Sequence, residues 1–93
     1  MALRVVWTRM AVSNLDGVGD YIAKDNPKAA ANLLKQIRKS VKLLQAQPFL
    51  GRRTEFEDVR DLVVHPNYIV SYRVDALTVQ ILQIWHVAQQ RYH

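Results

Sequence analysis

Three runs of residues typical of β-strands follow one another closely in the second half of the chain. They cover Val59–Val64, Tyr68–Val74 and Val79–Trp85, and they are rich in β-branched and aromatic residues, which favour extended backbone. The first link, His65-Pro66-Asn67, contains turn-forming residues, and the second, Asp75-Ala76-Leu77, is equally short. Since short links join antiparallel neighbours, this part of the chain predicts a three-stranded antiparallel meander.

The third run indicates how the meander is covered. Val79, Ile81 and Trp85 alternate with Gln80 and Gln83, which predicts one buried face. Extra apolar residues at positions 82 and 84 interrupt this alternation. We therefore expect the second face of the sheet to be partly covered as well.

The first half of the chain has the periodicity of two helices after one short strand. Leu3–Trp7 is a short apolar run, and Thr8 is a suitable N-cap for a helix over Arg9–Lys24. The Asn26-Pro27 pair is a second helix start, because asparagine caps helices and proline suits the first helical position. Apolar residues then recur every three or four positions until Gln47-Pro48 ends the pattern.

The predicted order of elements is therefore β-α-α-β-β-β. Neither helix has enough apolar surface to stand alone, so we expect an antiparallel helical hairpin packed on one face of an antiparallel sheet, an α+β fold. The 93 residues contain no linker or internal repeat, and they suffice for one hydrophobic core. Residues 1–93 are expected to form a single domain.

Charge and cysteine content limit the possible functions. A formal net charge of +5 suggests an acidic partner, either nucleic acid or protein, although lysines that only keep the chain soluble would give the same excess. The chain has no cysteine, and its histidines lack ligand spacing, so we expect no metal and no cofactor. No signal peptide or membrane-spanning run is visible, which favours a cytoplasmic location.

Several short motifs occur in a fixed order along nearly the whole chain. They are Ala11, Asp20-Tyr21-Ile22-Ala23, Asn26-Pro27, Ala30, Pro48-Phe49-Leu50-Gly51-Arg52, Val59-Arg60-Asp61-Leu62, Tyr68-Ile69-Val70-Ser71-Tyr72-Arg73-Val74 and Trp85-His86. Together with the order of elements, they resemble the RelE/ParE superfamily of toxins from bacterial type II toxin–antitoxin systems. The long helical hairpin makes the chain most similar to the ParE branch.

The resemblance to ParE toxins implies a function and two partners. ParE toxins inhibit DNA gyrase and are silenced by a co-encoded antitoxin, usually ParD-like, whose disordered C-terminal segment wraps over the toxin. The residues expected to bind an acidic antitoxin segment are Arg52, Arg53, Arg60, Tyr68, Tyr72 and Arg73. The residues expected to contact the target are His86, Gln89, Arg91 and Tyr92, because the C-terminal end is linked to toxicity in ParE relatives.

The other branch of the superfamily leaves a second function open. RelE-like toxins cut mRNA on the ribosome without a metal, using a base, an acid and cations that stabilise the phosphorane. Most of the cations of RelE are missing here. By similarity to the nuclease YafQ, the catalytic residues would be Arg60, Asp61, His65 and His86.

The catalytic residues inferred by similarity to YafQ form an incomplete set. Val63 and Asn67 stand where YafQ has an active-site histidine and aspartate. His65 lies two residues from Val63 and shares its face if the strand is regular, in which case it could partly replace the missing histidine. The resemblance therefore favours a gyrase inhibitor over an enzyme, with a metal-independent, ribosome-dependent endoribonuclease as the alternative.

The same residues also have structural interpretations. His86 could hydrogen-bond only to backbone, and Arg60 and Arg73 could pair with neighbouring aspartates. Tyr68 and Tyr72 share one face of a strand and could belong to the core.

Overall fold

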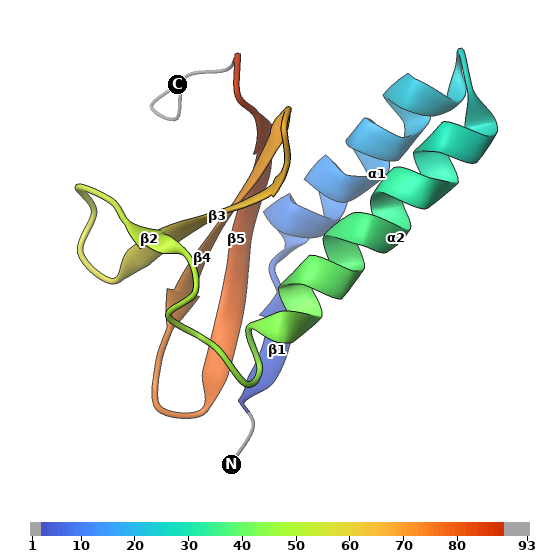
Figure 1. Cartoon of the computed structure of the whole chain (residues 1–93). Coiled ribbons are helices and arrows are strands. Elements are labelled where there is room, and N and C mark those ends of the chain that lie inside the picture. Colours follow the sequence, from blue (N-terminus) through green and yellow to red (C-terminus); the bar gives the residue numbers. More distant parts are fainter. Residues whose placement is uncertain (1–2, 89–93) are drawn as a thin grey trace.

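The computed structural model describes residues 3–88. The elements are β1 (Arg4–Trp7), α1 (Arg9–Ala23), α2 (Pro27–Leu43), β2 (Arg52–Arg53), β3 (Val59–His65), β4 (Tyr68–Val74) and β5 (Thr78–His86). The five strands form one sheet in the order β1-β5-β4-β3-β2, and both helices lie on one face of it (Figure 1). The predicted α+β fold with a helical hairpin is confirmed.

The sheet is mixed, which corrects the predicted antiparallel sheet. β1 runs parallel to β5, with Arg4 opposite Thr78 and Trp7 opposite Ile81. The pairs β5–β4, β4–β3 and β3–β2 are antiparallel. The pattern of a four-residue run does not show which distant strand it joins or in which direction. The sequence also fails to predict β2, because two arginines have no strand pattern.

Both helices begin where the sequence predicts, because both N-caps form. The Thr8 hydroxyl accepts a hydrogen bond from the N–H of Ala11 at 3.2 Å, and the Asn26 side chain accepts one from the N–H of Ala29 at 3.0 Å. α2 ends at Leu43, before the predicted Gln47-Pro48. The next residues form tighter turns, because the N–H groups of Leu44, Gln45 and Ala46 bond to carbonyls three residues earlier rather than four. Leu44 itself is fully buried in the core.

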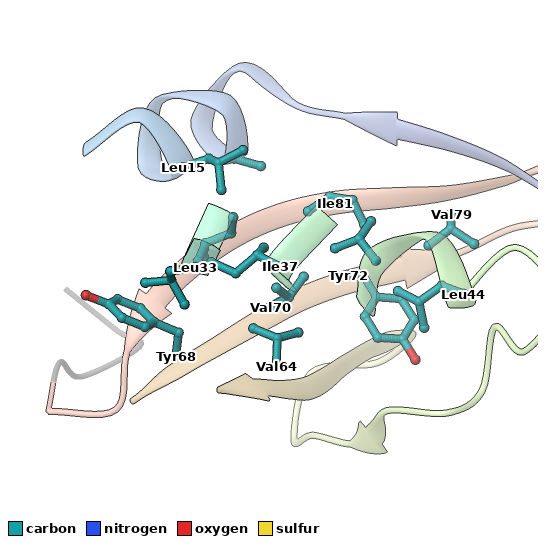
Figure 2. Close-up of a cluster of buried hydrophobic side chains, with 13 residues drawn as sticks. Leu15, Leu33, Ile37, Leu44, Val64, Tyr68, Val70, Tyr72, Val79 and Ile81 are labelled. Carbon is teal, nitrogen blue, oxygen red and sulfur yellow. The ribbon is translucent and has the colours of Figure 1, made fainter. Parts of the chain in front are cut away.

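The hydrophobic core lies between the helical hairpin and the sheet. Figure 2 shows Leu33 and Ile37 of α2 facing Val70 of β4, with Leu15 of α1 on the other side of the cluster. The core strand residues are Val64, Tyr68, Val70, Tyr72, Val79, Ile81 and Ile84. Within residues 3–88, no helix lies on the opposite face of the sheet (Figure 1).

A β-bulge explains the broken alternation in the last strand. Ser71 is opposite Gln83 and Tyr72 is opposite Ile81, so Leu82 is an extra residue without a partner in β4. A bulge shifts the alternation of faces by one residue. Ile81 and Ile84 therefore both point into the core, and the apolar residue at position 84 belongs to the helix side.

Candidate functional site

A groove opens where the β3–β4 turn and the end of β5 meet α1. Its volume is about 730 Å³. It is lined by Ser13, Asn14, Gly17, Val18, Tyr21, Ile22, Ala29, Leu33, His65, Asn67, Tyr68, Ile84, Trp85 and His86. The side chain of Asn14 accepts a hydrogen bond from the N–H of Ile84 at 3.0 Å, which fixes α1 against β5 beside this groove.

Two histidines flank one tyrosine in the groove. The ring centroids of His65 and Tyr68 are 5.8 Å apart, and those of Tyr68 and His86 are 5.2 Å apart in an edge-to-face arrangement. The sequence predicts both histidines as site residues, and the structure brings them to the same tyrosine. Burial raises the pKa of the Tyr68 phenol above its ordinary value, so this hydroxyl keeps its proton at neutral pH.

Both histidines use the same ring nitrogen in the same way. The Nδ1 atom of His65 accepts a hydrogen bond from the N–H of Asn67, and the Nδ1 atom of His86 accepts one from the N–H of Ala88, each at 3.0 Å. A neutral imidazole that accepts at Nδ1 carries its proton at Nε2. In the neutral form, the histidines therefore present an N–H donor at Nε2 rather than a basic nitrogen.

His65 reaches the groove because β3 is irregular. Val63 is opposite Ile69 while His65 is opposite Tyr68, so the register shifts between them. Ile69 and Tyr68 lie on opposite faces of β4, and residues opposite each other in a ladder share a face. The expectation that His65 shares the face of Val63 is therefore wrong.

Asp61 lies on the other face of the sheet, away from the histidines. It is buried, and its Oδ1 atom accepts a hydrogen bond from the Ser71 hydroxyl at 2.7 Å. The same hydroxyl accepts a hydrogen bond from the indole N–H of Trp85 at 2.9 Å. This carboxylate is thus engaged in a buried network and is separated from His65 and His86 by the sheet.

Arg60 lies on the helix-side face of the sheet, near the opposite end of β3 from His65, and its side chain holds a loop in place. Its guanidinium donates to the carbonyl oxygen of Gly51 at 2.9 Å and lies 5.0 Å from the ring centroid of Phe49. The buried hydroxyl of Tyr72 holds the same loop, accepting from the N–H of Gly51 and donating to the carbonyl of Pro48, each at 2.8 Å. We call residues 48–51 the latched loop.

The residues predicted to bind an antitoxin do not form one surface. Arg52 is opposite Asp61 and Arg73 is opposite Val59, which places both on the helix-free face. Arg53 is opposite Arg60, on the other face. Tyr68 and Tyr72 belong to the hydrophobic core, and Tyr72 has no exposed surface in this conformation. A partner could therefore reach the four arginines but not Tyr72.

The predicted target contacts are only partly described by the structure. His86 lines the groove, whereas Gln89, Arg91 and Tyr92 lie outside the described residues.

Sequence reasoning missed the contribution of α1 to the groove. Ser13, Gly17 and Tyr21 recur every four residues, which places them on one side of the helix. Tyr21 is 72% exposed. These residues lie beside the apolar stripe of the same helix, whose Val18 and Ile22 also line the groove, and that spacing is the signal that could have identified the groove wall.

The described part of the site offers little for phosphate chemistry or metal binding. None of the lining residues among positions 3–88 is lysine or arginine. No group of three histidine, cysteine or carboxylate side chains in the same part of the chain could hold a metal ion.

Neither helix in residues 3–88 has the length and apolar character of a membrane span.

Comparison with known families identifies the class of protein. Residues 5–91 match the family of ParE toxins of the type II toxin–antitoxin system parDE. The chain therefore belongs to the ParE toxin family, within the RelE/ParE superfamily.

Individual relatives agree with this assignment. The chain is 39% identical over 88 residues to Y4kP, a candidate toxin of Sinorhizobium fredii, covering 94% of this chain and 91% of the relative. It is 34% identical to toxin RelE2 of Caulobacter vibrioides, covering 92% of this chain and 97% of that protein. A chain of the chromosomal ParDE system from P. aeruginosa has 32% identity and a TM-score of 0.81, with 92% of this chain and 97% of that chain covered.

Proposed function

We propose that this ParE-family toxin inhibits growth by poisoning DNA gyrase and that a co-encoded antitoxin neutralises it. The observation that carries the proposal is the separation of the candidate catalytic groups. His65 and His86 both contact Tyr68 in the groove, Asp61 is buried on the other face of the sheet, and Arg60 holds the latched loop.

Cleavage of RNA requires a base, an acid and a cation around one phosphate. The described groove has two imidazoles whose Nδ1 atoms already accept backbone hydrogen bonds, and no described lining residue is lysine or arginine. This arrangement supports inhibition through protein contacts over catalysis. Gyrase and the antitoxin are both cytoplasmic in this proposal, so the chain would act there.

The exposed apolar surface supports an antitoxin partner. Eleven large hydrophobic side chains in the described part of the chain are exposed, among them Tyr21, Phe49, Val63 and Leu77. Two of them, Phe49 and Phe56, line the same groove, and neighbouring exposed apolar side chains of this kind mark a surface that a partner covers. A solved relative is the ParDE system of P. aeruginosa, which agrees with a ParD-like antitoxin for this chain.

The test combines the chain with gyrase, supercoiled plasmid and ATP, followed by detergent and protease. Gyrase poisoning predicts linear DNA, and prior addition of the antitoxin should prevent it. If gyrase produces no linear DNA with an excess of folded chain, the proposal fails.

A ribosome-dependent endoribonuclease is the second candidate, favoured by the convergence of His65 and His86 on Tyr68. His86→Ala separates the two functions. A nuclease should lose nearly all cleavage of mRNA on translating ribosomes, whereas gyrase poisoning should persist if the variant remains folded. Arg73→Ala is a matched control, because Arg73 is exposed on the other face of the sheet.

A further inference from the structure

The positive charge of the chain is concentrated on α2. The whole chain has 13 basic and 8 acidic residues, which gives a formal net charge of +5. α2 holds five of the basic residues and none of the acidic ones. The rest of the chain therefore has as many basic as acidic residues, and the whole excess charge lies on this one helix. A surface that is charged only for solubility usually mixes both signs.

Three of these cations form a row on the side of α2 that faces away from the sheet. Lys28, Lys35 and Lys42 follow one another at intervals of seven residues, which is close to two helical turns. Lys35 lies two residues from both Leu33 and Ile37, which are buried in the core, so it points to the opposite side of the helix. All three lysines are exposed. We call them the lysine row, and at 1.5 Å per residue the row is about 21 Å long.

The other two cations of α2 add to the charge along the row. Arg38 and Lys39 are also exposed, and they lie four residues from Lys42 and Lys35 respectively. Like charges at that spacing repel each other and destabilise a helix. α2 has no acidic residue that offsets this repulsion. A line of negative charge bound along the row would offset it.

The residues on the exposed side of α2 favour nucleic acid over protein as the partner. Protein interfaces depend on apolar anchors and contain few lysines. Among the described residues of α2, Leu43 at its end is the only large hydrophobic one that is exposed. Interfaces with DNA are instead strongly positive. Lysine ammonium groups bind phosphates as point charges, without reading the bases.

The length and the residue types of the row fit a duplex better than a single strand. Duplex DNA carries about one charge per 1.7 Å of its axis, so about 21 Å of duplex presents roughly twelve phosphates to the cations of α2. Proteins that bind single strands stack the bases on aromatic side chains. The sequence of α2 contains no aromatic residue.

We propose that α2 binds the phosphate backbone of duplex DNA through the lysine row, Arg38 and Lys39. The inference deepens the gyrase poisoning proposed above, on which the identity of the DNA rests: the duplex is the segment that gyrase holds. The toxin would then contact this DNA as well as the enzyme. The contact is independent of base sequence, because the cations reach phosphates rather than base edges.

Fluorescence anisotropy with a labelled duplex of about 20 base pairs, at several salt concentrations, tests the site directly. The chain is made by cell-free synthesis. The variant with Lys28→Gln, Lys35→Gln and Lys42→Gln should bind at least about tenfold more weakly at low salt. It should also reduce the slope of log Kd against log salt by roughly 2–3, because each phosphate contact contributes about 0.9. The native chain should bind two duplexes of unrelated sequence with affinities within about threefold.

A matched control removes the same charge from exposed positions outside α2. It combines Arg4→Gln, Arg9→Gln and Lys24→Gln, and it should change the salt slope by less than about 1. All six substituted positions are exposed, and glutamine is a good helix former, so both variants should fold. Circular dichroism verifies this.

The gyrase assay described above identifies the DNA that α2 contacts. For the same amount of linear DNA, the lysine-row variant should require at least about tenfold more protein than the control variant. If it loses duplex affinity but poisons gyrase as well as the control, the contact with DNA held by gyrase is refuted. If the native chain yields no linear DNA but binds the duplex through the lysine row, the gyrase proposal fails and the DNA site on α2 stands.

Two further outcomes would overturn the DNA site itself. If the lysine-row variant binds the duplex as tightly as the control, the lysine row makes no phosphate contact. If it instead loses affinity only for the protein encoded by the neighbouring gene, α2 is a surface for an acidic protein and not for DNA.

Discussion

Replacing Tyr72 by phenylalanine should destabilise the fold by removing one buried hydroxyl. The phenol has no exposed surface and makes two hydrogen bonds of 2.8 Å to the latched loop. Phenylalanine keeps the ring, so the change leaves little cavity and removes mainly the hydrogen bonds. Gly51 is buried, and its N–H would lose the only acceptor given by the described residues.

The size of the effect follows from these two bonds. A buried donor without a partner costs about 1–3 kcal/mol. The carbonyl of Pro48 contributes less, because Pro48 is only partly buried and water can reach its surroundings. We expect a loss of about 2 kcal/mol in the free energy of unfolding and, at roughly 4–8 °C per kcal/mol, a melting temperature lower by about 8–16 °C.

Urea unfolding followed by circular dichroism measures this loss, with Tyr21→Phe as the matched control. Tyr21 is mostly exposed, so removal of its hydroxyl should change stability by less than about 0.5 kcal/mol. Faster exchange of the Gly51 amide in Tyr72→Phe would place the damage in the latched loop. If Tyr72→Phe is as stable as Tyr21→Phe, the hydroxyl does not hold the loop as described.

Three further predictions concern stability. Burial raises the pKa of Tyr68 and Tyr72 in the folded chain, so the unfolded chain loses these protons first. The contribution of the two phenols to stability should therefore be constant below about pH 10 and be lost as the pH rises above it; equal unfolding free energies at about pH 8 and pH 11 would contradict this. Ser71→Ala removes the hydroxyl that joins Asp61 and Trp85. It should lower the free energy of unfolding in urea by about 1.5–3 kcal/mol, and a loss below about 0.5 kcal/mol would argue against the network. Asn26→Ala removes the cap of α2 and should lower the free energy of unfolding by about 0.5–2 kcal/mol. Asn32 is exposed inside the same helix, so Asn32→Ala should not lower it. If both variants are equally stable, Asn26 does not act as a cap.

Local signals in the sequence predict the helices and the meander well. The cap residues Thr8 and Asn26 act through atoms only three positions away, so the sequence shows both helix starts directly. The β4 strand is predicted with its observed bounds, because its strand pattern is strong and turn residues flank it. These features need no knowledge of distant parts of the chain.

Distant contacts account for what the sequence does not show. The direction of β1 depends on its pairing with β5, and the position of His65 depends on a register shift against β4. The sequence identifies His65 and His86 as candidates, but it does not show that Asp61 lies on the other face. Bulges change which residues share a face without changing the composition of a strand.

The parallel pairing of β1 with β5 has a consequence for synthesis of the protein on the ribosome. The Thr8 hydroxyl bonds to the carbonyl of Ile81, 73 residues later. The first strand made must therefore wait for the last, and a contact of such sequence separation forms late. A chain that stops before β5 has no strand for β1 to pair with and no acceptor for the Thr8 hydroxyl. Truncated products should thus lack a complete sheet and be degraded, whereas chains that include β5 can fold.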